Sequence, residues 1–316
     1  MKDHNHLTIA GIPHFNPYVK PTLELVLSLL AAAYEDEAYL DRVLSKMSEE
    51  VFAELKKEIE KLVKDGKLDL QQKIDLNNNP AILMALKRIE QKELHRFTDY
   101  IWIGSKVIGE SMKRSYTDTL ATTYQMFNYT KAIDPYNLTT TGPKSLNAVV
   151  QITDTYLHEK VLNIPWCKDG KVYSERLYGH VSQFQKKLAF VLEEGISKGK
   201  GMDWMMKSWR KLTGSTAYDT ARLLKTETMA MWSIATKAAY LEMGIEYVEI
   251  VGDAECGGIC LDYVDGAPIP LAEAEIGDLL PPYHPNCACS YVAYEEIVEV
   301  PSEEIEEEEI SPDEIE

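Results

Sequence analysis

The sequence predicts an α+β fold that is mostly α-helical: a long N-terminal helical region, further helices, and a small β-rich unit with clustered Cys and His residues. Apolar side chains recur every three or four positions as far as Gly244, which is typical of helices. After Gly244 the pattern changes to short β-rich segments. With 316 residues, 45% of them hydrophobic, the chain can bury one large core or two modest ones.

The first part of the chain is expected to hold an arm and a helical domain. Residues 1–21 form the arm, because Pro13 and Pro17 lie there among polar side chains. The helical domain follows over 22–140. Ser48 is interpreted as an N-cap that separates the first two helices, and Gly66 as the end of the second. The predicted helices of this domain span 22–46, 48–66 and 81–116.

Aromatic side chains follow at helical spacing over 116–136. We interpret them as core, because a stacking surface for nucleic acid would have Arg interleaved with the rings. A Thr-Thr-Thr-Gly-Pro loop over 139–143 marks a domain boundary. The second domain, 141–294, is expected to begin with helices, which span 145–162, 174–195, 202–212 and 215–244. Ser215 is the expected N-cap of the last helix, and Gly244 its end.

The β-rich unit closes this second domain. Residues 246–251 and 290–294 have strand composition, and Asp265-Gly266 is a hairpin signal ahead of 267–271. The cysteines therefore lie on loops between strands that are too short to form a stable sheet alone.

The acidic charge of the chain is concentrated at its end. Residues 295–316 contain twelve Asp and Glu and no Lys or Arg, so the tail carries −12 of the net charge of −18. Such a run repels itself and predicts a disordered tail, either solubilising or binding a basic partner. Neither role favours tight, direct DNA binding. No apolar run has the length of a membrane span, so we expect a soluble protein.

Four of the five cysteines gather near the C-terminus, in Cys256-Gly-Gly-Ile-Cys260 and His284-Pro-Asn-Cys287-Ala-Cys289. Paired thiols on two loops, with a histidine beside the second pair, predict a structural Zn²⁺ site. A tetrahedral ion has four coordination positions, so one of these five candidate ligands is surplus. The alternatives are inert buried thiols or disulfides, and disulfides are disfavoured because the N-terminus has no secretory signal.

A catalytic metal would need a general base nearby. The chain contains no His-x-Glu and no His-Glu-x-x-His. We therefore expect a protein that is not an enzyme. A zinc-dependent hydrolase or nuclease, or an effector delivered with a virion, is the alternative.

The second half resembles the phage head morphogenesis, or minor capsid, family that includes the phage Mu F protein. The resemblance rests on motifs in a fixed order. They are Pro165-Trp-Cys-Lys-Asp-Gly-Lys-Val-Tyr-Ser-Glu-Arg-Leu177, Ala221-Arg-Leu-Leu-Lys-Thr-Glu227, Cys260-Leu-Asp-Tyr-Val-Asp-Gly266 and His284-Pro-Asn-Cys-Ala-Cys289. The family commonly has Cys-x2-Cys where this chain has Cys-x3-Cys, and Arg at Ala288.

The resemblance implies a minor capsid protein inside the phage head, present in the host cytoplasm during assembly. Its expected partners are the portal protein and a capsid or scaffolding protein, with indirect contact with packaged DNA and no membrane. The resemblance also implies a role in head assembly and in DNA packaging and ejection. The motif residues expected to make structural or interface contacts are Trp166, Arg176, Arg222, Thr226, Glu227 and Gly266.

Overall fold

The computed structural model describes residues 16–127, 161–252, 260, 262–263 and 266–294. Its helices are α1 (Val19–Lys64), the 3-10 helix η1 (Leu76–Asn78), α2 (Pro80–Leu94), α3 (Phe97–Met126), α5 (Tyr173–Ser197) and α6 (Gly201–Met243). Its strands are β1 (Tyr247–Val251), β2 (Ile269–Pro270) and β3 (Ser290–Ala293). The predicted fold class, mostly helical with a small β unit, is confirmed.

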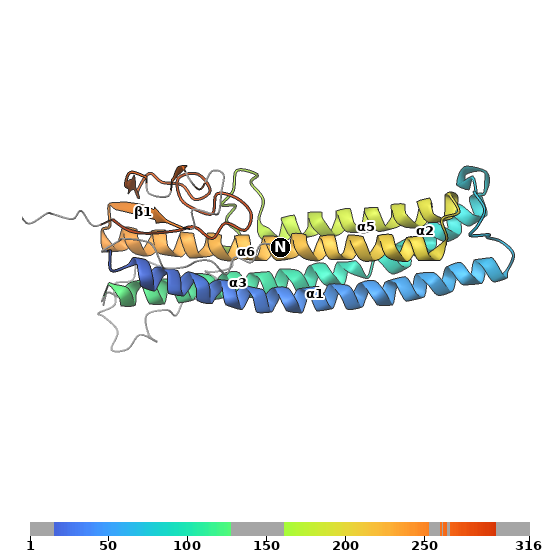
Figure 1. The fold of residues 1–316 in the computed structure, drawn as a ribbon, viewed down its shortest axis with the longest axis horizontal. Helices are drawn as coiled ribbons and strands as arrows, with labels where there is room; N and C mark the ends of the chain where they lie inside the picture. The colour runs from blue at the N-terminus through green and yellow to red at the C-terminus, as the bar shows by residue number, and fades with distance from the viewer. Residues whose placement is uncertain (1–15, 128–160, 253–259, 261, 264–265, 295–316) are drawn as a thin grey trace, which may run out of the picture.

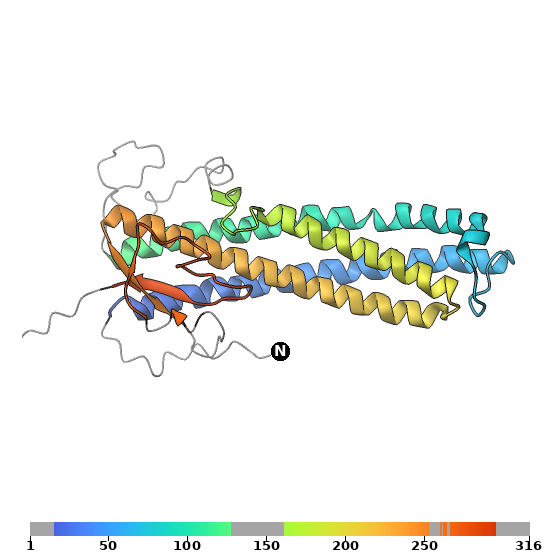
Figure 2. The same ribbon diagram turned by 90° about the horizontal axis from the view of Figure 1, so that it is seen from above.

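Four long helices, α1, α3, α5 and α6, run side by side in an elongated bundle (Figures 1 and 2). Helix α6 packs against each of the other three. One hydrophobic core joins residues from both halves of the chain, such as Leu55 and Tyr100 with Leu177 and Leu224. The boundary predicted over 139–143 lies outside the described residues, and the helices on its two sides share this core.

Helix α1 is continuous through Ser48, so the prediction of two helices with a cap at this position is wrong. Ser48 is buried, and its hydroxyl oxygen accepts a hydrogen bond from Trp209 Nε1 at 2.7 Å. The same oxygen lies 2.6 Å from Thr213 Oγ1. Because α6 satisfies the serine side chain, it does not compete for the backbone of its own helix. The predicted end at Gly66 is close to the observed end at Lys64.

The helix predicted over 81–116 is instead two helices, α2 and α3, separated at His95 and Arg96. At this break the carbonyl oxygen of Leu94 accepts a hydrogen bond from Gln185 Nε2 of α5 at 2.8 Å. The Gln185 side chain of α5 thus donates to one of the carbonyl groups that have no partner within α2.

Helix α6 continues through Gly214 and Ser215, where the sequence predicted an interruption, so that prediction is also wrong. Ser215 is exposed, and a Cβ atom on Gly214 would meet no other atom within 4 Å. The apolar side chains on both sides of this point are buried in one core, which keeps the helix intact. The predicted end at Gly244 is confirmed: this residue has φ 79° and closes the helix.

The three strands form an antiparallel sheet in the order β2-β1-β3. All four residues of β3 are buried, and Tyr291 packs against Trp232 and Tyr240 of α6. Val292 packs with Val19 and Leu23, at the start of α1. The sheet therefore lies at one end of the bundle (Figure 2). The strands predicted over 246–251 and 290–294 are confirmed.

The aromatic residues that begin the predicted core stripe are packed inside the molecule. Tyr116 and Tyr124 are buried, and Phe127 stacks on Tyr18 with ring centroids 4.1 Å apart. The rest of that stripe and most of the helix predicted over 145–162 lie outside the described residues, as do residues 1–15 of the arm and the acidic tail. Within the described ranges, no helix combines the length and apolarity needed to cross a membrane.

Gly214 inside α6 and Gly244 at its C-cap give a paired prediction. Gly214→Ala should raise the free energy of unfolding by about 0.5–1 kcal/mol, because alanine favours the helix and open space surrounds the site. Gly244→Ala should lower it, because φ is positive there. Urea unfolding followed by circular dichroism measures both. A destabilised Gly214→Ala variant would contradict a continuous, unstrained α6.

Candidate metal centre

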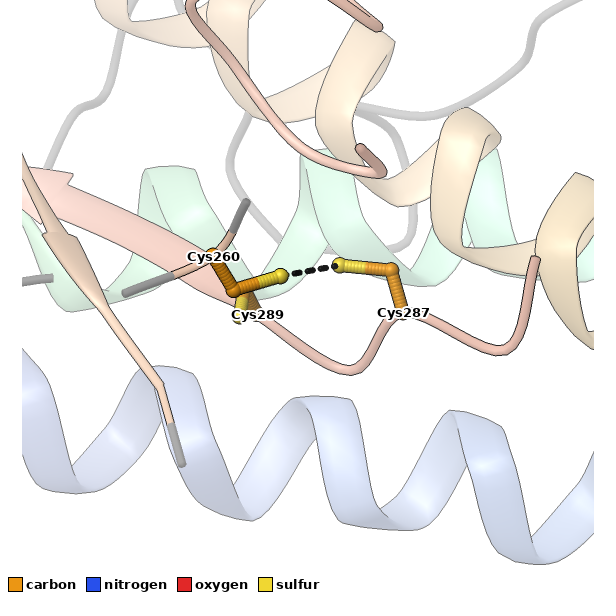
Figure 3. A group of neighbouring side chains, drawn as sticks. All are labelled: Cys260, Cys287 and Cys289. Carbon is orange, nitrogen blue, oxygen red and sulfur yellow. Dashed lines mark hydrogen bonds between the residues drawn. The ribbon is translucent and has the colours of Figure 1, made fainter. Parts of the chain in front are cut away.

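Three buried thiols meet between the sheet and the loops beside it. Cys260, Cys287 and Cys289 are at most 1% exposed, and their three Sγ atoms all lie within 4.8 Å of one another. Figure 3 shows the side chains of Cys260 and Cys287 pointing toward each other, with Sγ atoms 3.8 Å apart. That separation is far longer than the roughly 2.05 Å of a disulfide. The three sulfurs are placed to hold a metal ion together.

His284 lies beside the thiols in a defined orientation. Its Nε2 atom is 3.1 Å from Cys260 Sγ, and its Nδ1 atom is 2.9 Å from the carbonyl oxygen of Pro285. Since a carbonyl oxygen can only accept, this contact places the proton of the neutral imidazole on Nδ1 and leaves the lone pair on Nε2, beside Cys260. Metal-binding histidines are commonly oriented in this way by a backbone carbonyl.

The turn that carries His284 and Cys287 is attached to α6. Asn286 has a positive φ of 63°, which asparagine tolerates better than most residues, and Cys287 N–H donates to His284 O at 3.1 Å. Thr226 Oγ1 accepts from Asn286 N–H at 3.1 Å and donates to the carbonyl oxygen of Arg222 at 2.6 Å. The Thr226 hydroxyl therefore both accepts and donates a hydrogen bond, and it holds the turn in a fixed position on α6.

A pair of stacked rings joins the two arms of the site. Tyr263, which follows Cys260, stacks on Tyr283, which precedes His284, with centroids 4.7 Å apart and an interplanar angle of 9°. Tyr283 also donates its hydroxyl proton to Leu279 O at 3.0 Å. The stack holds thiol-bearing segments from distant parts of the sequence against each other.

Cys289 depends on a glycine that the sequence did not single out. A Cβ atom on Gly252, just after β1, would lie 2.8 Å from Cys289 Sγ and 3.2 Å from its Cβ. The end of β1 can therefore approach this thiol only because residue 252 has no side chain. Its position immediately after a predicted strand was the available signal.

Four of the five predicted ligands are thus accounted for in the described structure. Cys260, Cys287 and Cys289 come together, and His284 contacts the first of them. Cys256 lies outside the described residues. Gly266 is near the site, with its N–H donating to Tyr263 O at 3.3 Å, and Asp265 lies outside the described residues.

The remaining motif residues form a buried polar network next to the thiols. Glu227 of α6 is 1% exposed; its Oε1 accepts from Arg176 Nη1 of α5, and its Oε2 accepts from Trp166 Nε1 at 2.8 Å. Burial raises the pKa of Glu227, while Trp166 and Arg176 favour its ionised form. Arg176 also binds both carboxylate oxygens of Asp169, at 2.7 and 3.1 Å.

The structure divides the roles of the α6 motif residues. Thr226 contacts the turn at Asn286, whereas Glu227 contacts α5 and the loop before it. Arg222 Nη2 lies 3.3 Å from Asp219 Oδ1 of the same helix, and the Arg222 guanidinium lies over the ring of Tyr218. Thr226 therefore orients α6 against the Cys-containing unit, and Glu227 orients it against α5.

The close approach at Gly252 gives a stability prediction. Gly252→Ala should lower the free energy of unfolding by about 1–3 kcal/mol, because the added methyl group overlaps Cys289. Gly179→Ala, where a Cβ meets no atom within 4 Å, is the matched control and should be neutral or stabilising. Denaturant titration of both variants tests this. Equal stability of the two variants would contradict the contact.

Comparison of the chain with family models, curated proteins and solved structures gave no match.

Proposed function

We propose that this chain is a phage minor head protein that associates with the portal and takes part in head assembly and in DNA packaging and ejection. The supporting observation is that the residues carrying the family resemblance also make the contacts between segments. Trp166 and Arg176 both donate hydrogen bonds to Glu227, and Thr226 accepts one from the turn of the closing His-Pro-Asn-Cys motif. An ordered set of motifs with a common structural purpose is the pattern expected of a shared module.

The surface of the bundle supports a role in protein assembly. Several large aromatic side chains are exposed on its helices, among them Trp102 at 69%, Tyr178 at 60% and Phe190 at 60%. Exposed aromatic residues are enriched where proteins bind other proteins. The portal is the proposed partner, together with a capsid or scaffolding protein; contact with packaged DNA is indirect, and the proposed location is inside the head.

The metal is proposed to be a structural Zn²⁺ ion. The three clustered thiols, together with the imidazole that lies 3.1 Å from Cys260 Sγ, are the ligand types of a Cys₃His structural zinc site. The 3.8 Å between the sulfurs of Cys260 and Cys287 equals the separation of about 3.8 Å that tetrahedral zinc imposes with Zn–S bonds of about 2.3 Å. When bound, the ion would join loops whose own strands are short.

A non-catalytic role fits the polar groups beside the thiols. The carboxylate of Glu227 is occupied by Arg176 and Trp166, and the Nδ1 proton of His284 is directed to Pro285 O. These groups are committed to structural bonds. The alternative, a zinc-dependent hydrolase or nuclease using His284, would gain support if the purified protein had activity that His284→Ala abolished without unfolding it.

Metal content tests the zinc site. Freshly purified protein should contain about one Zn per chain by elemental analysis. Cys287→Ser should lose most of it, whereas Cys167→Ser, outside the thiol cluster, should retain it. Chelation should increase hydrogen exchange in β1 and β3 more than in α3. A metal-free protein of undiminished stability would rule the site out.

Co-expression tests the partner. The chain should co-purify with the portal protein encoded in the same genome, and it should be present in purified heads. As a comparison, the chain is co-expressed with the major capsid protein of the same genome in the absence of the portal protein. Failure to bind the portal, together with absence from heads, would exclude the proposed role whatever the metal content.

A further inference from the structure

A cavity of about 310 Å³ lies between the loop before α5, helices α5 and α6, and the turn at Pro282–Pro285. It is distinct from the thiol cluster, although His284 borders both. Its size is at the lower end of the range for small-molecule sites. Nothing in the proposed assembly role requires such a cavity.

The acidic groups of the cavity are already satisfied. Both oxygens of Asp169 accept from Arg176, and both oxygens of Glu227 accept, one from Arg176 and one from Trp166. Lys168 is paired with Asp278 at 3.0 Å. Arg176 pairs with the carboxylates of both Asp169 and Glu227, and Arg222 adds a further positive charge to the lining, so a cationic ligand would find no uncompensated negative charge in the described lining.

Donor capacity is available on Arg222. Its side chain is 39% exposed and has one terminal nitrogen 3.3 Å from Asp219, and within the described part of the chain its other guanidinium donors have no hydrogen-bond partner. A guanidinium has five N–H donors and no acceptor. The ligand should therefore bring a hydrogen-bond acceptor.

Arg222 is a cationic donor of the cavity lining, and His180 lines the same cavity. Burial lowers the pKa of His180, Asp219 opposes this, and Arg222 and Arg176 lower it further. An acceptor beside Arg222 can be a carboxylate, because a guanidinium offers paired N–H groups that match its two oxygens.

The rest of the lining is largely apolar. Trp166, Leu223 and Pro282 supply rings and an aliphatic side chain from three different segments. These surfaces favour burial of a nonpolar group rather than a sugar or a second charge.

We propose that this cavity binds an apolar carboxylate: the carboxylate accepts hydrogen bonds from Arg222, and the apolar body lies against Trp166, Leu223 and Pro282. Two sources offer this chemistry. One is a free small aromatic or aliphatic acid, and the other is the C-terminal residue of a partner polypeptide.

Ligand-observed NMR titration of the full chain tests the proposal with phenylacetate and its neutral counterpart, phenylacetamide. Phenylacetate should bind, and the amide should bind at least about tenfold more weakly, the effect of losing a charge-assisted hydrogen bond. Arg222→Gln should weaken phenylacetate binding about tenfold. Arg210→Gln, an exposed arginine of the same helix outside the cavity lining, should leave it unchanged.

A short peptide ending in phenylalanine, as free acid and as C-terminal amide, distinguishes the sources. Tighter binding of the free-acid peptide than of phenylacetate identifies a polypeptide terminus, and binding of phenylacetate alone identifies a free small acid. The proposal is overturned if phenylacetate does not bind at about 10 mM, above the range expected for such a fragment. Equal binding of acid and amide to the unmodified protein, which needs no variant to fold, overturns it as well.

Discussion

The buried carboxylate of Glu227 is the constraint around which the Cys-containing end of the molecule is organised. A charge removed from water is tolerated only with bonded partners, and here they come from two other segments: Arg176 on α5 and Trp166 in the preceding loop. The next residue back, Thr226, fixes the turn at Asn286. Two consecutive residues of α6 thus set the positions of the loop, the turn and, through the turn, the thiols.

Periodicity predicted the helical content correctly but misplaced the helix ends. Ser48 and Ser215 have the chemistry of N-caps, yet both lie inside continuous helices. The hydroxyl of Ser48 is satisfied by Trp209, which is 161 positions away in sequence, and a local pattern cannot reveal such a partner. The break at His95 was missed for a related reason, because Gln185 of another helix bonds the carbonyl of Leu94. At Gly244, which has a positive φ, the glycine in the sequence was enough to predict the helix end.

The thiol cluster was more predictable than its surroundings, because metal ligands are few in type and recur at short spacings. Cys260, Cys287 and Cys289 meet as the pattern indicated. What the pattern could not supply was the support for the site. The bond between Trp166 and Glu227 spans 61 positions, and the need for glycine at 252 arises only when β1 approaches Cys289. Both depend on tertiary packing.

The side-by-side helices make the molecule elongated, with different segments of the chain at its two ends (Figure 1). Helix α6 has 43 residues and is about 65 Å long, and the Cys-containing unit lies at one end of the bundle while the connection from α1 to α2 lies at the other (Figure 1). The result is a rod with two chemically different ends. Each long helix packs against its neighbours along the rod. The surface at the thiol end therefore lies several nanometres from the surface at the opposite end.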